Sequence, residues 1–231
     1  MSYQPYISSP TEVLRQQSVM TRVYAWMTAG LFSTGAIALF VANSPAIRDL
    51  IFGSSIIFFG LIIAQVAVVW ILSANINRMS STAATAMFLG YALLNGLTFS
   101  AIFLAYTSTS IASTFFVTAG TFGAMSLYGY TTKRDLSSFG GLLTMALIGF
   151  FLASIVNLFL QNSVLYWIIT YIGVALFIGL TAYDTQKIKA MTAAARDEES
   201  GQRVAILGAL TLYLDFINLF LLLLRILGNR R

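Results

Sequence analysis

The sequence predicts an all-α integral membrane protein with about seven transmembrane helices. Hydrophobic residues make up 58% of its 231 residues, charged residues make up only 9%, and the mean hydropathy is +0.82. A soluble globular domain carries about 25% charged residues. Apolar stretches of about 20 residues, the length that crosses a bilayer as a helix, recur between short polar segments. These observations place most of the chain inside a membrane.

The first twenty residues differ from the rest. Residues 1–20 are largely polar and contain Pro5 and Pro10, so we expect a mobile polar tail followed by a single transmembrane domain at residues 21–231. The first apolar stretch, Val23–Ala42, is long enough to cross a bilayer and longer than the core of a cleaved signal peptide. We therefore expect it to remain in the mature protein.

Polar breaks rich in Asn, Ser, Thr and charged residues divide the remainder into six further apolar segments. Each segment is about 20 residues long, which suffices for one crossing. The seven expected spans are Val23–Ala42, Leu50–Leu72, Thr82–Ala105, Ile111–Tyr130, Phe139–Leu160, Leu165–Asp184 and Val204–Leu227.

Lysine and arginine concentrate on alternate connections, and the opposite side has only Arg48 before the last span. The positive-inside rule therefore predicts that the N-terminus is cytoplasmic. Seven crossings would place Arg230 and Arg231 outside, against the same rule, so the last segment is either a full crossing or re-entrant. The cations of the rich side are Arg78, Lys133, Arg134, Lys187, Lys189, Arg196 and Arg203.

The chain contains no Cys and no His, which removes thiol and imidazole nucleophiles, thiolate and imidazole metal ligands, and Ser-His triads. Carboxylates and hydroxyls without a nucleophile-base arrangement leave little catalytic chemistry, so we expect no enzyme and no cofactor. The net charge of +5 comes from short clusters rather than a basic stripe. We therefore expect lipids, and not nucleic acid, around this protein.

Two aspartates, Asp184 and Asp215, lie in the stretches LFIGLTAYDTQKIK and LTLYLDFINLFLLLLRI. The position midway between them falls in the charged turn Asp197–Gly201, so a symmetric antiparallel hairpin would bring them to one depth. Counting inward from the apolar boundaries instead puts Asp184 near the surface and Asp215 about 10 residues deep, roughly 15 Å. The two estimates agree only if helix continues into both flanks of the loop.

A carboxylate is expensive inside a bilayer and usually faces a bundle interior or a wet cavity, so each aspartate is a candidate functional residue. If the two meet, they cannot both ionise cheaply and should share a proton, which would make them a pH sensor. Carboxylates, helix carbonyls and water are also suitable ligands for Ca²⁺. In the alternative, structural interpretation, Asp184 is satisfied by Thr185, Lys187 or water, and Asp215 bonds Asn218, Tyr213 or a neighbouring helix.

Three other side chains bear on the pair. Arg78 ends a break on the predicted cytoplasmic side, where it is either a bidentate partner for a carboxylate or an orientation signal. Arg225 follows Asp215 by about ten residues, roughly 15 Å, and snorkelling is its expected role. Gln65 lies in the middle of a segment, where an interhelical hydrogen bond is the usual arrangement.

Two long C-terminal motifs, TAYDTQKIK at Thr181–Lys189 and GALTLYLDFINLFLLLLRILG at Gly208–Gly228, resemble signatures of the Bax inhibitor-1 family. The segment GAMSLYGYTTKRDLSSFG at Gly123–Gly140 resembles the central part of that family. The similarity runs from about Arg22 to the C-terminus and is greatest to bacterial inner-membrane members. It implies a bacterial inner-membrane protein of seven helices with the last helix central in the bundle.

The resemblance also implies a function: a pH-sensitive calcium leak controlled by an aspartate pair that falls here on Asp184 and Asp215. It implies that Arg78 latches one aspartate and that acidification opens the pathway by releasing this arginine. A second latch of some members would use Arg225, but Gln65 stands where its acidic partner is expected. Only a neutral hydrogen bond could replace that ion pair.

The alternative class of function is a non-conducting regulator that binds other membrane proteins, such as a membrane-bound AAA protease. Bacterial relatives in the family suggest this role. The polar N-terminal tail and the mixed-charge loop Arg196–Arg203 would be its contact surfaces.

Overall fold

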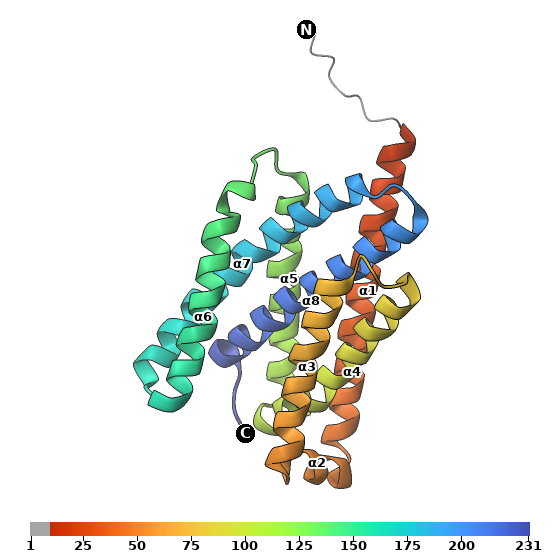
Figure 1. Cartoon of the computed structure of the whole chain (residues 1–231). Coiled ribbons are helices and arrows are strands. Elements are labelled where there is room, and N and C mark those ends of the chain that lie inside the picture. The colour runs from red at the N-terminus through yellow and green to blue at the C-terminus, as the bar shows by residue number, and fades with distance from the viewer. Residues whose placement is uncertain (1–9) are drawn as a thin grey trace.

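The computed structural model of the chain describes residues 10–231 (Figure 1). Seven of its helices are long and apolar enough to cross a membrane, which confirms the predicted fold class. The elements are α1 (Pro10–Ala42), α2 (Pro45–Phe52), α3 (Ser55–Asn75), α4 (Ser81–Ala105), α5 (Ser108–Thr131), the 3₁₀ turn η1 (Ser137–Phe139), α6 (Gly140–Leu160), α7 (Ser163–Ala194) and α8 (Glu198–Leu227).

The first helix is longer than the sequence pattern indicated. Helix α1 begins at Pro10, and both Val19 and Met20 are buried, so the boundary expected at residue 20 falls inside a helix. The physical reason is that polar residues before the apolar stretch contact another helix, since the Gln16 amide donates to the Lys189 carbonyl of α7 at 3.1 Å. The part of the expected tail before Pro10 lies outside the described residues.

The second expected span, Leu50–Leu72, is interrupted near its start. Helix α2 begins at Pro45, and the backbone N–H of Gly53 closes it by donating to Asp49 O at 2.8 Å. Ser54 is extended, and α3 then runs to Asn75. A proline suits the first turn of a helix, because a backbone N–H at that position would have no partner within the helix. The chain therefore forms a short helix before the crossing.

The charged segment between α7 and α8 is mostly helical rather than a loop. Helix α7 continues to Ala194, and α8 begins at Glu198. Asp197 caps α8, because its carboxylate accepts a hydrogen bond from the Ser200 N–H at 2.7 Å and the Ser200 hydroxyl oxygen accepts from the Asp197 N–H at 3.1 Å, a capping box. The hydrogen bonds from Ser200 lower the pKa of the Asp197 carboxyl. Helix therefore does continue into both flanks, as the two depth estimates required.

Helix α8 packs against α1, α4, α5 and α7. In the most apolar stretch of α8, 61% of the residues are buried inside the protein, whereas in that of α6 none are. Figure 1 shows α6 beside α7 at the left of the view and α3 beside α4, and α3 packs on α4 while α6 packs on α7. The exposed apolar side chains of α3 and α6 therefore face the surrounding lipid.

Helix α8 crosses the whole bundle. At its first turns, the Arg203 guanidinium donates to the Asn77 carbonyl in the α3–α4 turn at 3.1 Å. Past its last turn, the Arg231 N–H donates to the Ala105 carbonyl at the end of α4 at 3.0 Å. Since α4 runs from the first of these ends to the second, α8 extends between the same two ends of the bundle as α4, which favours a full crossing over a re-entrant segment.

Candidate functional site

Close contact between α7 and α8 sets the position of the two aspartates. A Cβ atom placed on Gly208 of α8 would lie 2.8 Å from a methyl carbon of Ile188 on α7, so only glycine permits this approach. Asp184 lies one turn before Ile188, and Asp215 lies two turns after Gly208. The crossing of the helices therefore places the two carboxyl groups beside each other.

Asp184 and Asp215 are both buried, with exposed fractions of 9% and 5%. Asp184 lies on α7 and Asp215 on α8, and both side chains line the same cavity. Oδ2 of Asp215 is buried and has no hydrogen-bond partner among the described residues. A carboxylate oxygen in that state favours a proton, a water molecule or a cation.

Both aspartates line one cavity of about 690 Å³ between α3, α4, α6, α7 and α8. Most of its wall is apolar, so few polar groups are available to a solute inside it. Besides the aspartates, these polar or part-polar side chains are Gln65, Ser73, Tyr91, Asn95, Thr211 and Asn218.

Asn95 is a cavity residue that the sequence analysis missed. It is 4% exposed, and its Nδ2 has no hydrogen-bond partner among the described residues. An amide in the middle of the apolar segment Thr82–Ala105 was the available signal, because polar side chains inside a bilayer are often functional. The cavity thus contains two unpartnered polar atoms, one on Asn95 and one on Asp215.

A buried aromatic contact fixes the rotation of α8. The Tyr213 hydroxyl lies 2.7 Å from the Thr34 hydroxyl of α1, and its ring meets Phe88 and Tyr91 of α4 edge-on at centroid distances of 6.0 and 5.8 Å. Residues two apart on a helix point about 200° apart. Anchoring Tyr213 against α1 and α4 therefore turns Asp215 toward α7.

The partners named in the structural interpretation of the aspartates are mostly engaged elsewhere. The Thr185 hydroxyl lies 3.0 Å from the Ser126 hydroxyl of α5, and Asn218 Nδ2 donates to the Leu214 carbonyl at 2.8 Å. Tyr213 bonds Thr34, as described above. Lys187 lies one turn beyond Asp184 on α7, where its ammonium stands 5.9 Å from the centroid of the Tyr183 ring.

The structure does not bring Arg78 to the aspartates. It is exposed in the turn after α3, and no ion pair among the described residues joins it to Asp184 or Asp215. The neighbouring carbonyl, that of Asn77, is held by Arg203 instead. The latch that the resemblance implied is therefore not formed in this structure.

Arg225 and Gln65 contact different partners rather than each other. The Arg225 guanidinium stands over the Tyr166 ring, 5.3 Å from its centroid. The Gln65 amide donates to the Leu94 carbonyl at 3.1 Å and to the Thr98 hydroxyl at 3.2 Å, which confirms the predicted interhelical bond. The second latch has no counterpart here.

A second cavity, of about 640 Å³, continues from the first toward the C-terminal end of α8. It shares Phe151, Asn218 and Leu221 with the aspartate cavity. Arg225 and Arg230 line its far part. The two cavities therefore adjoin at Asn218 and together follow the second half of α8.

The protein offers few ligands for a metal ion at this site. Among the side chains described, those of residues 14–231, no three His, Cys, Asp or Glu gather as a metal centre. Because Ca²⁺ takes six to eight oxygen ligands, an ion between Asp184 and Asp215 would need water or backbone carbonyls as well. Such an incomplete ligand set suits brief contact with a passing ion better than tight binding.

The chain is similar to known protein sequences over nearly its whole length. Residues 16–231 match the protein family described as Inhibitor of apoptosis-promoting Bax1. The inner membrane protein YbhL of Escherichia coli strain K12 is 58% identical over 217 residues, which cover 93% of each chain. The uncharacterized protein RP147 of Rickettsia prowazekii is 47% identical over 92% of this chain and 89% of its own. An uncharacterized protein of Borreliella burgdorferi is 44% identical over 95% of both.

Proposed function

Because the chain belongs to the Bax inhibitor-1 family of membrane proteins, we propose that it is a pH-sensitive, calcium-permeable leak channel in a bacterial inner membrane. The observation that supports this most is the pair of buried carboxyl groups, Asp184 and Asp215, in one cavity of the bundle. The cation-rich ends of the helices favour a cytoplasmic N-terminus by the positive-inside rule. No catalytic step is part of the proposal.

The proposed gate is the charge state of the pair. Two ionised carboxylates side by side in a buried site repel each other, whereas one shared proton lets them remain together. Since Asp184 belongs to α7 and Asp215 to α8, a change in protonation alters the force between these helices. It would thereby shift the balance between a closed and an open packing of α8.

The proposed pathway follows the two adjoining cavities. An ion would pass from the aspartates along Asn218 to the cavity that contains Arg225 and Arg230. Two guanidinium groups at that mouth lower the local concentration of cations. This supports a slow leak rather than a high-throughput channel.

In this proposal neither Arg78 nor Arg225 is paired with an acidic side chain in the conformation described here. Arg78 is exposed, so an Arg78 latch requires the α3–α4 turn to move toward the aspartates in another conformation. In the conformation described here, Lys187 lies one turn beyond Asp184 on α7, and its ammonium stands 5.9 Å from the centroid of the Tyr183 ring. Arg225 stabilises the far mouth through Tyr166 rather than through an acidic partner.

The test is calcium entry into proteoliposomes that contain the purified protein, measured between about pH 6 and 8. The variants are Asp184→Asn and Asp215→Asn, which remove charge but keep side-chain size. Asp49→Asn is the matched control, since Asp49 is exposed and pairs only with its neighbour Arg48. We expect pH-dependent flux in the native protein and in the control, and loss of the pH dependence in each dyad variant.

Two results would count against the proposal. Flux with an unchanged pH profile in both dyad variants would remove the aspartates from the gate. Flux no greater than in empty liposomes at every pH would favour the alternative function, a non-conducting regulator that binds other membrane proteins such as a membrane-bound AAA protease. In that case the segment Arg196–Arg203 is the first surface to examine for partner binding.

A further inference from the structure

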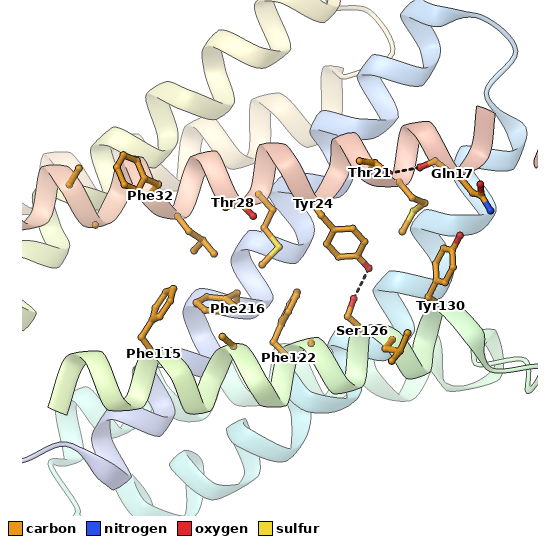
Figure 2. A pocket seen from close by; sticks show the side chains of 18 of the residues that line it. Gln17, Thr21, Tyr24, Thr28, Phe32, Phe115, Phe122, Ser126, Tyr130 and Phe216 are labelled. Atoms are coloured by element: carbon orange, nitrogen blue, oxygen red, sulfur yellow. Dashed lines mark hydrogen bonds between the residues drawn. The ribbon is translucent and has the colours of Figure 1, made fainter. Parts of the chain in front are cut away.

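A large groove separates α1 from α5. Its volume is about 1200 Å³, more than the few hundred to about 1000 Å³ of most small-molecule sites. Figure 2 shows the two helices on opposite sides of the groove, with Phe115 and Phe122 projecting into it and Phe216 of α8 at its floor. One hydrogen bond, between the Tyr24 and Ser126 hydroxyls at 2.6 Å, bridges it.

Two glycines line the groove from opposite sides and face open space. A Cβ atom added to Gly35 on α1 or to Gly123 on α5 would meet nothing within 4 Å. By contrast, a Cβ on Gly96 would lie 2.6 Å from Ile37, where α4 packs on α1. The glycines of the groove therefore do not serve contact between helices of this chain.

The groove is polar at one end, with a lysine just beyond its lining, and apolar along the rest. Gln17, Thr21 and Tyr130 line the polar end. The Lys189 ammonium donates to the Tyr130 carbonyl at 2.7 Å and stands 4.5 Å from the centroid of its ring. From there the lining continues along α1 to Leu39, about 20 residues or roughly 30 Å of helix.

We propose that this groove binds a phospholipid with an anionic headgroup. The acyl chain lies along the apolar part, over Phe216, and the phosphate lies at the end marked by Lys189 and Tyr130. Charge complementarity selects this occupant, because the groove ends at Tyr130, whose carbonyl and ring contact the Lys189 ammonium on the cation-rich side of the bundle. A flexible acyl chain also fits a long groove that opens between two helices toward lipid. The proposal does not depend on ion conduction.

The test measures which lipid stays bound. Purified protein is reconstituted in vesicles of equal parts phosphatidylglycerol and phosphatidylethanolamine, released with mild detergent and examined by native mass spectrometry. Gly123→Leu fills the groove. Gly120→Leu is the matched control, because Gly120 is on the same helix, also meets nothing within 4 Å and does not line the groove. Lys189→Gln removes the charge near the headgroup.

We expect the native protein and Gly120→Leu to retain phosphatidylglycerol several-fold more than phosphatidylethanolamine. Gly123→Leu should retain several-fold less lipid of both kinds, and Lys189→Gln should lose the preference for the anionic lipid. Equal retention by the native protein and Gly123→Leu would overturn the proposal. So would a lipid-free dimer that Gly123→Leu dissociates, since the groove would then hold a second copy of the chain.

Discussion

The hydroxyl groups of Tyr213 and Thr34 lie 2.7 Å apart in the buried interior of the protein. Tyr213 belongs to α8 and Thr34 to α1, and both side chains are buried. This contact acts on the candidate site without touching it, because Asp215 follows Tyr213 by two residues on the same helix. The rotation of α8 that allows the Tyr213–Thr34 hydrogen bond also turns Asp215 toward its cavity.

Tyr213→Phe should lower the free energy of unfolding by about 0.5–1.5 kcal/mol, the usual net value of one hydrogen bond. The measurement is thermal unfolding in detergent. Tyr171→Phe is the control, because Tyr171 is exposed and is held by ring stacking on Trp167 rather than by its hydroxyl. Equal melting temperatures of the two variants would show that the Thr34 contact does not stabilise α8.

Asn95→Leu should reduce calcium flux at least several-fold while the protein remains folded. The side chain is buried with an unpartnered Nδ2 in the aspartate cavity, and leucine removes a polar contact for a hydrated ion. Leucine is similar in size to asparagine and removes the unpartnered Nδ2 donor, which offsets part of the stability lost with the rest of the amide. Flux and melting temperature are measured on one preparation, beside Asn43→Leu, which changes an exposed amide. Native flux in Asn95→Leu would exclude this amide from the pathway.

Gly208→Ala should destabilise the protein by about 1–3 kcal/mol, the usual cost of overpacking. The added methyl group would lie 2.8 Å from a carbon of Ile188 and 3.1 Å from a carbon of Val23. Gly60→Ala is the control, since its methyl group meets nothing within 4 Å and raises helix propensity. The two variants should therefore shift the melting temperature in opposite directions, and a shift in the same direction would contradict the tight crossing of α7 and α8.

Asp197→Ala should lower the melting temperature above about pH 4 and leave it nearly unchanged well below that pH. The capping hydrogen bonds from Ser200 hold the pKa of Asp197 below its ordinary value in the folded protein. A carboxyl group with a lowered folded pKa stabilises the protein above its unfolded pKa of about 3.9, and this contribution is lost as the pH falls through the folded value. Asp197→Asn should retain most of the cap, because asparagine also caps helices. A pH-independent difference between Asp197→Ala and the native protein would show that the carboxylate is not the cap.

Much of the fold could be predicted from the sequence. The number of crossings follows from the lengths of the apolar segments. The last expected span, Val204–Leu227, ends at the same residue as α8. The two intramembrane carboxylates were identifiable for the same reason, since a charged residue in such a segment stands out without any knowledge of its neighbours. The interhelical hydrogen bond of Gln65 was expected on similar grounds and is present.

Errors arose where neighbouring helices decide the outcome. The start of α1 at Pro10 and the helical flanks of the α7–α8 connection lie in polar sequence, which hydropathy assigns to loops. For Arg78 the sequence left two roles open, a partner for a carboxylate or an orientation signal, and the side chain is exposed in this structure. Which side chain reaches which depends on the rotation and crossing of helices, and these are set by contacts such as Gly208 against Ile188.

The sequence by itself determined the membrane environment, the seven crossings and the two helices that carry Asp184 and Asp215, because hydropathy and segment length are properties of consecutive residues. Only the tertiary structure decided that these aspartates share a cavity with Asn95, and that α1 and α5 leave a groove between them. Cavities and carboxylate pairs depend on how helices distant in sequence pack. That packing is set by side-chain shape across several helices at once.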